Sequence, residues 1–197
     1  MNAFEEGDEV ILDACRLDRV DLGTLDSTVA RSPENSLVRS DNAQNLYRWR
    51  FNMKTGEVKE ARLDDALADF PRVNDSLVSR KARYGYAARF GSGSGMPEAD
   101  AIVKYDLQSG TSRTHVHGTG RYSGEAVFIP RDGATAEDDG WVGFYVFDNN
   151  TGSSEFVLVA SQDFEAQPVA RVVLPQRVPY GFHGAWISSE QMATQRS

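Results

Sequence analysis

The sequence contains few of the residues that form disulfides or bind metals through sulfur and imidazole. Its 197 residues include one cysteine, Cys15, and three histidines, His115, His117 and His183. A single cysteine excludes an internal disulfide framework and a zinc site built from cysteines, and it fits a reducing cytosol. A metal site made of three histidines of this chain would need all of them.

Long apolar runs and an excess of positive charge are also missing. No run approaches the roughly 18 apolar residues of a membrane-spanning helix. The acidic residues 1–6 lack the apolar core of a signal peptide. With 21 Lys and Arg against 29 Asp and Glu, the net charge is −8, which argues against a nucleic-acid-binding protein. We therefore expect a cytoplasmic location and no nucleic-acid partner.

Hydrophobic residues make up 40% of the chain, which is enough for a packed core in one domain. Their spacing is mostly that of β-strands. Apolar and polar residues alternate over 47–53, which predicts a strand. Its apolar face consists of Tyr47, Trp49, Phe51 and Met53. A turn at Gly56 and a returning strand over 57–63 complete a hairpin.

The same hairpin form is expected twice more along the chain. Residues 101–117 turn at Gly110, and residues 141–159 turn at Gly152. The three turn glycines are spaced by about 54 and about 42 residues, the scale of one four-stranded propeller blade. The pattern predicts an all-β protein and leaves both a β-propeller and a β-sandwich open.

The other segments favour loops, and no long amphipathic helix is predicted. One helical turn is expected over 63–67. Loops are expected at 32–41, 91–95 and 132–140, where Gly, Ser, Asp and Asn gather. The tail after Ser188 is polar and is expected to fray.

His183 is the residue most suggestive of chemistry. It lies among prolines, glycines and aromatic residues over 178–186, so an irregular backbone can direct its imidazole inward. A neutral imidazole is a common ligand of iron, zinc and copper. The alternative is a hydrogen-bonded core histidine, because most buried polar groups are simply satisfied.

Two carboxylates are candidate partners of a metal-bound histidine. Glu125 precedes an apolar strand, and Asp69 stands before Phe70 and Pro71. A carboxylate that accepts the ring N–H of a ligating histidine fixes its orientation and raises its basicity. The alternative for both residues is a solvated strand end.

The remaining candidates are weaker. His115 and His117 would point to the same face of a strand, which suits a metal pair, but a half-exposed strand is the more usual place for such residues. Cys15 follows an apolar strand, and a free cysteine there usually behaves as a small buried hydrophobic residue rather than as a nucleophile.

Five segments together resemble the carotenoid oxygenase family, which includes carotenoid, apocarotenoid and stilbene cleavage dioxygenases and the retinal pigment epithelium isomerase. They fall in the family's order and run nearly from end to end of the chain, and the last two are specific. The segments are Asn2–Asp8 (NAFEEGD), Asp69–Arg72 (DFPR), Arg83–Tyr86 (RYGY), Gly124–Arg131 (GEAVFIPR) and Pro179–Gly184 (PYGFHG).

The resemblance implies part of a seven-bladed β-propeller with Fe(II) on its axis, held by four histidines and supported by carboxylates. In such enzymes O₂ cleaves a conjugated C=C bond of an apolar polyene or stilbene into two carbonyl products. His183 matches the fourth histidine ligand and Glu125 matches a supporting glutamate. Asp69 falls where the family usually has a glutamate, and its side chain is one methylene shorter.

The chain departs from the family at its start. Asn2 matches the asparagine of the family's NAFEE segment. The resemblance places the third histidine ligand a few residues before that asparagine, so it would fall before Met1. The first two ligands and about half of the propeller are also missing. His115 and His117 do not match ligand positions. We expect residues 1–188 to be the C-terminal part of a propeller domain and residues 189–197 to be a polar tail.

Three functional hypotheses follow. In the first, the chain is a fragment of an Fe(II) dioxygenase and is inactive alone. In the second, it is a non-catalytic β-rich module that binds an apolar ligand. In the third, a separate chain supplies the N-terminal half and the two close one propeller. Half a propeller would expose a sheet edge and the face of its last blade.

Overall fold

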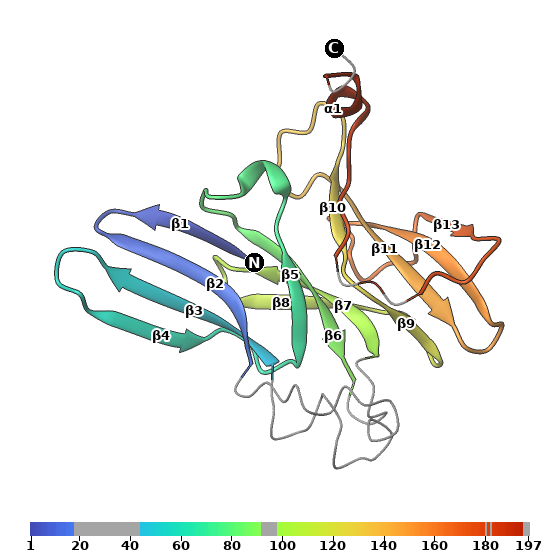
Figure 1. Ribbon diagram of the computed structural model, residues 1–197, viewed down its shortest axis with the longest axis horizontal. Coiled ribbons are helices and arrows are strands. Elements are labelled where there is room, and N and C mark those ends of the chain that lie inside the picture. Colours follow the sequence, from blue (N-terminus) through green and yellow to red (C-terminus); the bar gives the residue numbers. More distant parts are fainter. Residues whose placement is uncertain (18–43, 92–97, 180, 182, 195–197) are drawn as a thin grey trace.

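A computed structural model describes residues 1–17, 44–91, 98–179, 181 and 183–194. Almost all regular structure is antiparallel β-sheet, as the sequence predicted. Three four-stranded meanders follow one another across the molecule, from blue through green to orange in Figure 1. In this part of the chain no helix is long and apolar enough to cross a membrane.

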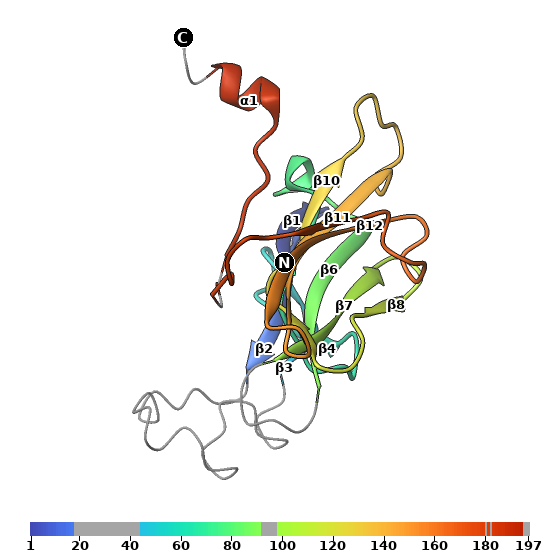
Figure 2. The ribbon, with the colours of Figure 1, turned by 90° about the vertical axis from the view of Figure 1, so that its right-hand side faces the viewer.

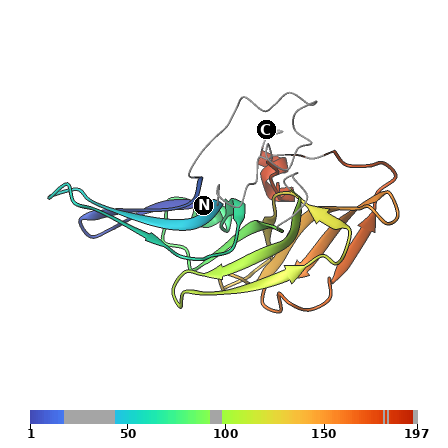
Figure 3. The same cartoon turned by 90° about the horizontal axis from the view of Figure 1, so that it is seen from below.

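The first meander is a separate sheet. It consists of β1 (Asn2–Glu6), β2 (Glu9–Leu17), β3 (Gln44–Asn52) and β4 (Val58–Arg62), paired in that order. Because residues paired across strands share a face, β2 and β3 place Val10 beside Phe51 and Leu12 beside Trp49. This sheet is seen at one end of the molecule in Figure 3.

The other two meanders form a nine-stranded sheet. The second meander consists of β5 (Ala68–Arg72), β6 (Tyr84–Phe90), β7 (Ala99–Asp106) and β8 (Thr111–Val116). The third consists of β10 (Val127–Pro130), β11 (Gly140–Asp148), β12 (Ser153–Ala160) and β13 (Ala170–Val173). The short strand β9 (Arg121–Ser123) pairs with β11 and, at one residue, with β7, so it joins the two meanders.

The turn glycines are confirmed, and the structure explains their uneven spacing. Gly56, Gly110 and Gly152 have φ of +76°, +70° and +70°, a conformation that glycine adopts at little cost. Gly56 and Gly110 join the third and fourth strands of their meanders. Gly152 joins the second and third strands of its own meander, which shortens the second interval.

Several local expectations need correction. The helical turn expected over 63–67 is wrong, because these residues form an irregular connection between β4 and β5. The tail does not fray immediately after Ser188, since residues 189–194 form the short helix α1 (Ser189–Thr194). This helix projects away from the sheets in Figure 2.

The predicted loops fare unevenly. The one at 132–140 is confirmed up to Asp139, and Gly140 already begins β11. The loops at 32–41 and 92–95 lie outside the described residues, while Gly91 follows β6 without regular structure. The division between a propeller part at 1–188 and a tail at 189–197 stays a prediction.

Two hydrophobic clusters hold the meanders together. The smaller one joins the first sheet to the second meander, because Leu46 of β3 packs with residues of β5 to β7. The larger one lies within the nine-stranded sheet and its connections. Its bulkiest members are Tyr86, Phe90, Phe128, Phe144 and Phe164.

A buried ion pair braces the first sheet. Asp13 of β2, with 1% of its side chain exposed, accepts hydrogen bonds from Arg48 Nε at 2.7 Å and Nη2 at 2.8 Å. Arg48 lies directly opposite it on β3. This two-point geometry compensates the cost of removing the carboxylate from water.

Removing Asp13 should therefore destabilise the protein markedly. Asp13→Ala leaves the partly buried Arg48 without its partner, and we expect a loss of about 3 kcal/mol in the free energy of unfolding measured by urea denaturation. Asp65→Ala, which removes the exposed partner of Arg62, should change it by less than about 0.5 kcal/mol. Equal losses in the two variants would contradict this account of the sheet.

Candidate functional site

His183 lies on the irregular segment that follows β13 and returns along the third meander. Its side chain is 75% exposed, so it is not a buried core histidine. The Nδ1 atom lies 3.2 Å from Oε1 of Glu125. Because a carboxylate accepts hydrogen bonds, Nδ1 is the donor in this contact. In the neutral tautomer of the ring that fits this contact, Nε2 carries no proton and its lone pair is available to a metal.

Glu125 stands between β9 and β10 and is the central acceptor of the site. Its side chain is 5% exposed. Besides the His183 ring, it accepts hydrogen bonds through Oε2 from the Gly184 N–H at 2.7 Å and from Arg72 Nη1 at 3.1 Å. The structure thus brings together two residues that are 58 positions apart in the sequence and that the sequence analysis selected.

Asp69 lies nearby but is not hydrogen-bonded to the imidazole. Its Oδ1 accepts the N–H of Phe70 at 2.7 Å. Burial raises the pKa of the Asp69 carboxyl, while that hydrogen bond and the charges of the Met1 amino group and His183 act in the opposite direction. Its role beside a metal stays a prediction, as do those of His183 and Glu125.

Phe70 and Arg72 of β5 also contact the site, although no sequence pattern indicated a role for either. The Phe70 ring meets the His183 imidazole edge-on, with centroids 5.9 Å apart and planes at 83°. The guanidinium of Arg72 reaches Glu125 and the carbonyl of Gly184. The DFPR segment was noted as a motif, but a contact between Arg72 and a carboxylate 53 positions away has no local signal.

His115 and His117 are core residues rather than members of a half-exposed strand. Each is 7% exposed. His115 Nδ1 donates to the Phe164 carbonyl oxygen at 3.2 Å, and His117 Nε2 lies 2.8 Å from Ser123 Oγ. Phe144 packs against both rings. Their burial is greater than expected because Phe144 packs on both rings and Phe164 also packs on His115.

Cys15 is confirmed as a packing residue rather than a nucleophile. It contacts the smaller hydrophobic cluster around Leu46. Burial raises the pKa of its thiol to about 12, and the negative charge of Asp69 adds to the shift. The thiolate needed for nucleophilic chemistry is therefore scarce at neutral pH.

The donor set of a complete metal site is not present in the described part of the chain. No group of three or more His, Cys, Asp or Glu side chains there could hold an ion. What the structure offers is one imidazole with an available nitrogen and a buried carboxylate that orients it. This fits one ligand of a site whose other ligands lie elsewhere.

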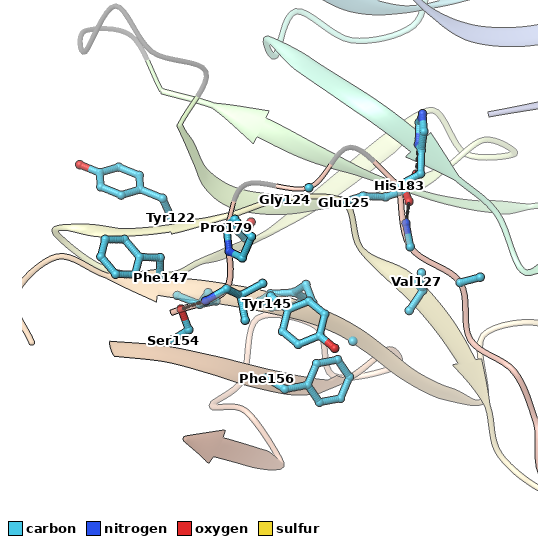
Figure 4. A pocket seen from close by; sticks show the side chains of 18 of the residues that line it. Tyr122, Gly124, Glu125, Val127, Tyr145, Phe147, Ser154, Phe156, Pro179 and His183 are labelled. Carbon is cyan, nitrogen blue, oxygen red and sulfur yellow. Dashed lines mark hydrogen bonds and ion pairs between the residues drawn. The ribbon is translucent and has the colours of Figure 1, made fainter. Parts of the chain in front are cut away.

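A cavity of about 570 Å³ opens beside His183 (Figure 4). It lies between the β11–β12 hairpin and the segment 177–187. Glu125 and His183 stand at one end, while the rings of Tyr145 and Phe156, 5.2 Å apart, lie further along. Its lining is mainly apolar and includes Val127, Phe147, Pro179, Trp186 and Ile187.

Comparison with known proteins decides the family. The family model described as retinal pigment epithelial membrane protein matches residues 1–188. The chain belongs to this family, the carotenoid oxygenases. The resemblance found in the sequence motifs is thereby confirmed.

Relatives named as carotenoid or apocarotenoid oxygenases are similar over 94% or more of this chain. The carotenoid 9,10(9′,10′)-cleavage dioxygenase of Crocus sativus is 39% identical over 211 aligned residues, covering 100% of this chain and 37% of the relative. The apocarotenoid-15,15′-oxygenase of Synechocystis is 32% identical over 94% of this chain and 37% of its own length. The chain thus spans little more than a third of these relatives.

A solved structure agrees with the fold. Cobalt-substituted Synechocystis apocarotenoid oxygenase superposes with a TM-score of 0.85 at 30% identity, over 95% of this chain and 38% of that one. The three meanders therefore match part of a seven-bladed propeller, as the motifs implied, and the sandwich alternative is wrong. No closed propeller is formed by the described residues. The cobalt substitution shows that this relative contains a metal centre.

The buried histidines predict a specific pH dependence of stability. Burial lowers the pKa of His117 to about 3, and the positive charges of His115 and Arg121 act in the same direction. An unfolded histidine titrates near pH 6.5. Below that pH the unfolded chain binds more protons than the folded one, so His117 favours unfolding increasingly as the pH falls toward 3.

His117→Gln should weaken this dependence. Between pH 7 and pH 5 the wild-type chain should lose about 2 kcal/mol of unfolding free energy through His117, and the variant should lack that loss. Urea denaturation at pH 7 and pH 5 measures this loss. The change in unfolding free energy between the two pH values is compared between the proteins, rather than their absolute stabilities. Parallel slopes in the two proteins would contradict the buried, neutral state of His117.

Proposed function

We propose that this chain is the C-terminal part of an Fe(II) dioxygenase that cleaves a conjugated C=C bond of a carotenoid, apocarotenoid or stilbene. The observation that supports it is the pairing of His183 with the buried Glu125 in a chain of the carotenoid oxygenase family. The activity needs residues beyond this chain, because the described part holds one candidate ligand and no group of three.

The residues present have definite tasks in this proposal. His183 would hold the iron through Nε2, while Glu125 keeps the ring proton on Nδ1 and fixes the direction of the imidazole. When bound, the iron would supply the activation of O₂, which amino-acid side chains alone cannot provide. The apolar cavity beside His183 offers contact area to an apolar substrate.

Asp69 would act less directly. It is partly buried near the Met1 amino group and His183 but bonds to the backbone of Phe70. We assign it to the support of a ligand that this chain does not supply. The cytoplasmic location stays part of the proposal.

The enzyme itself provides the test. An antibody against residues 183–194 isolates the native protein from cells that express it, and its mass, iron content and carotenoid cleavage are measured. We expect iron and cleavage in a polypeptide longer than 21.8 kDa or in a complex with a second chain. The isolated 197-residue chain should give neither. Stoichiometric iron and O₂ consumption by the isolated chain would contradict the proposal.

A substitution makes the same test residue-specific. His183→Ala in the active assembly should remove iron and lower cleavage by at least about 100-fold, the effect of losing a ligand or its supporting shell. Arg131→Gln removes an exposed pair with Asp139 and should leave both unchanged. Full iron content in His183→Ala would contradict the role of this residue.

The cavity favours a second candidate function, a non-catalytic module that binds an apolar ligand. An apocarotenal that enters the cavity lies against Trp186, so it should quench the tryptophan fluorescence of the 197-residue chain. Trp186→Phe should remove most of that quenching, whereas Trp49→Phe, on the first sheet, should not. Equal quenching in both variants would place the ligand elsewhere.

A further inference from the structure

Arg72 connects three segments that are distant in the sequence. It lies at the end of β5, and Nη1 donates to Oε2 of Glu125 at 3.1 Å and to the carbonyl oxygen of Gly184 at 2.8 Å. Nη2 donates to both carboxylate oxygens of Asp75, at 3.0 and 3.3 Å. The planar guanidinium suits such simultaneous bonds, which a lysine cannot reproduce.

These bonds fix the backbone next to the candidate metal ligand. The N–H of Gly184 donates to Glu125 while its carbonyl accepts from Arg72, so the residue after His183 is held on both sides. With this residue fixed and Nδ1 bonded to Glu125, the direction of Nε2 is determined. An exposed histidine would otherwise sample several rotamers.

Arg72 also supplies charge. The carboxylate of Glu125 is almost fully buried, and removing an ionised group from water is costly unless a partner compensates. Among the described residues, the ion pairs of Glu125 are those with Arg72 and His183. The guanidinium of Arg72 is always charged, so it supplies positive charge to the buried Glu125 carboxylate at 3.1 Å whatever the state of the imidazole.

The same strand shows backbone strain where it meets the imidazole. Phe70 has φ of +53°, a left-handed conformation that is strained for a non-glycine residue. The strand pairing of β5 with β6 is irregular between Asp69 and Arg72. The strained residue places its ring against His183, while Arg72 reaches the following residue.

We propose that Arg72 is a positioning residue: through Glu125 and the Gly184 carbonyl it fixes the direction in which His183 presents Nε2. That Nε2 is directed at a metal rests on the proposed function. The hydrogen-bonded arrangement of Arg72, Glu125 and Gly184 is a property of this chain and does not depend on a metal. Arg72 touches neither metal nor substrate in this role.

Hydrogen exchange in the 197-residue chain tests the arrangement without any metal. In Arg72→Gln, the exchange of the Gly184 amide measured by NMR should accelerate at least tenfold, while amides of β11 keep their rates. Arg72→Lys should give an intermediate change. The matched control is Arg89→Gln, which breaks a similar two-bond pair with Asp100 at 2.9 Å and should leave Gly184 unchanged.

Three results would overturn the inference. They are an unchanged Gly184 rate in Arg72→Gln, an equal acceleration in β11, or the same effect in Arg89→Gln. If Arg72→Gln does not fold, Asp75→Asn serves instead, since it weakens the anchor of Arg72 at an exposed carboxylate. It should accelerate Gly184 in the same direction by a smaller factor, and no acceleration would count against the inference.

A second measurement separates this inference from the proposed function. In the iron-containing assembly, Arg72→Gln should weaken iron binding by about tenfold, the scale of losing a group that orients a ligand, and Arg89→Gln should not. If the native assembly contains no iron, the proposed function fails. If it contains iron but Arg72→Gln changes neither the amide exchange rate of Gly184 nor the iron affinity, the proposed function stands and the positioning role fails.

Discussion

The arrangement around His183 depends on one buried carboxylate. Glu125 accepts hydrogen bonds from an imidazole, a backbone amide and a guanidinium, and these three groups belong to two different parts of the chain. Because its side chain is nearly inaccessible to water, these partners replace the lost hydration. Between β13 and α1 the described residues form no helix or strand, and this carboxylate ties that segment to the nine-stranded sheet.

The two faces of the first sheet are covered to different extents. One face, with Leu46 and the Asp13–Arg48 pair, packs toward the second meander. On the other face Trp49 and Phe51 are only half-buried, and Val58 is exposed. In a propeller both faces of an interior blade are covered, and the solved relative contains the additional blades that this chain, at 38% coverage, does not match.

The sequence predicted what local chemistry controls. Alternating residues around Trp49 and turn glycines such as Gly152 define strands and hairpins within a few residues, so they were readable without the fold. The specific motifs identified His183 and Glu125, which the structure brings together. The role of Arg72 and the burial of His117 depend on residues far away in sequence, and no pattern near them records those contacts. The helix α1 was missed because its six residues include only Met192 and Ala193 as apolar residues, which are adjacent and show no helical periodicity.

In the proposed site, Glu125 holds the proton of His183 on Nδ1 and thereby directs Nε2 toward a metal. NMR of the chain with ¹⁵N-labelled histidine tests this directly, because it contains only three histidines. The isolated chain offers one ligand and should bind metal only weakly, so Co(II) is added in excess. The paramagnetic effect should be strongest at Nε2 of His183 and absent from the buried His115 and His117, and Glu125→Gln should weaken the preference for Nε2. Binding through Nδ1, or no preference for His183, would contradict the account.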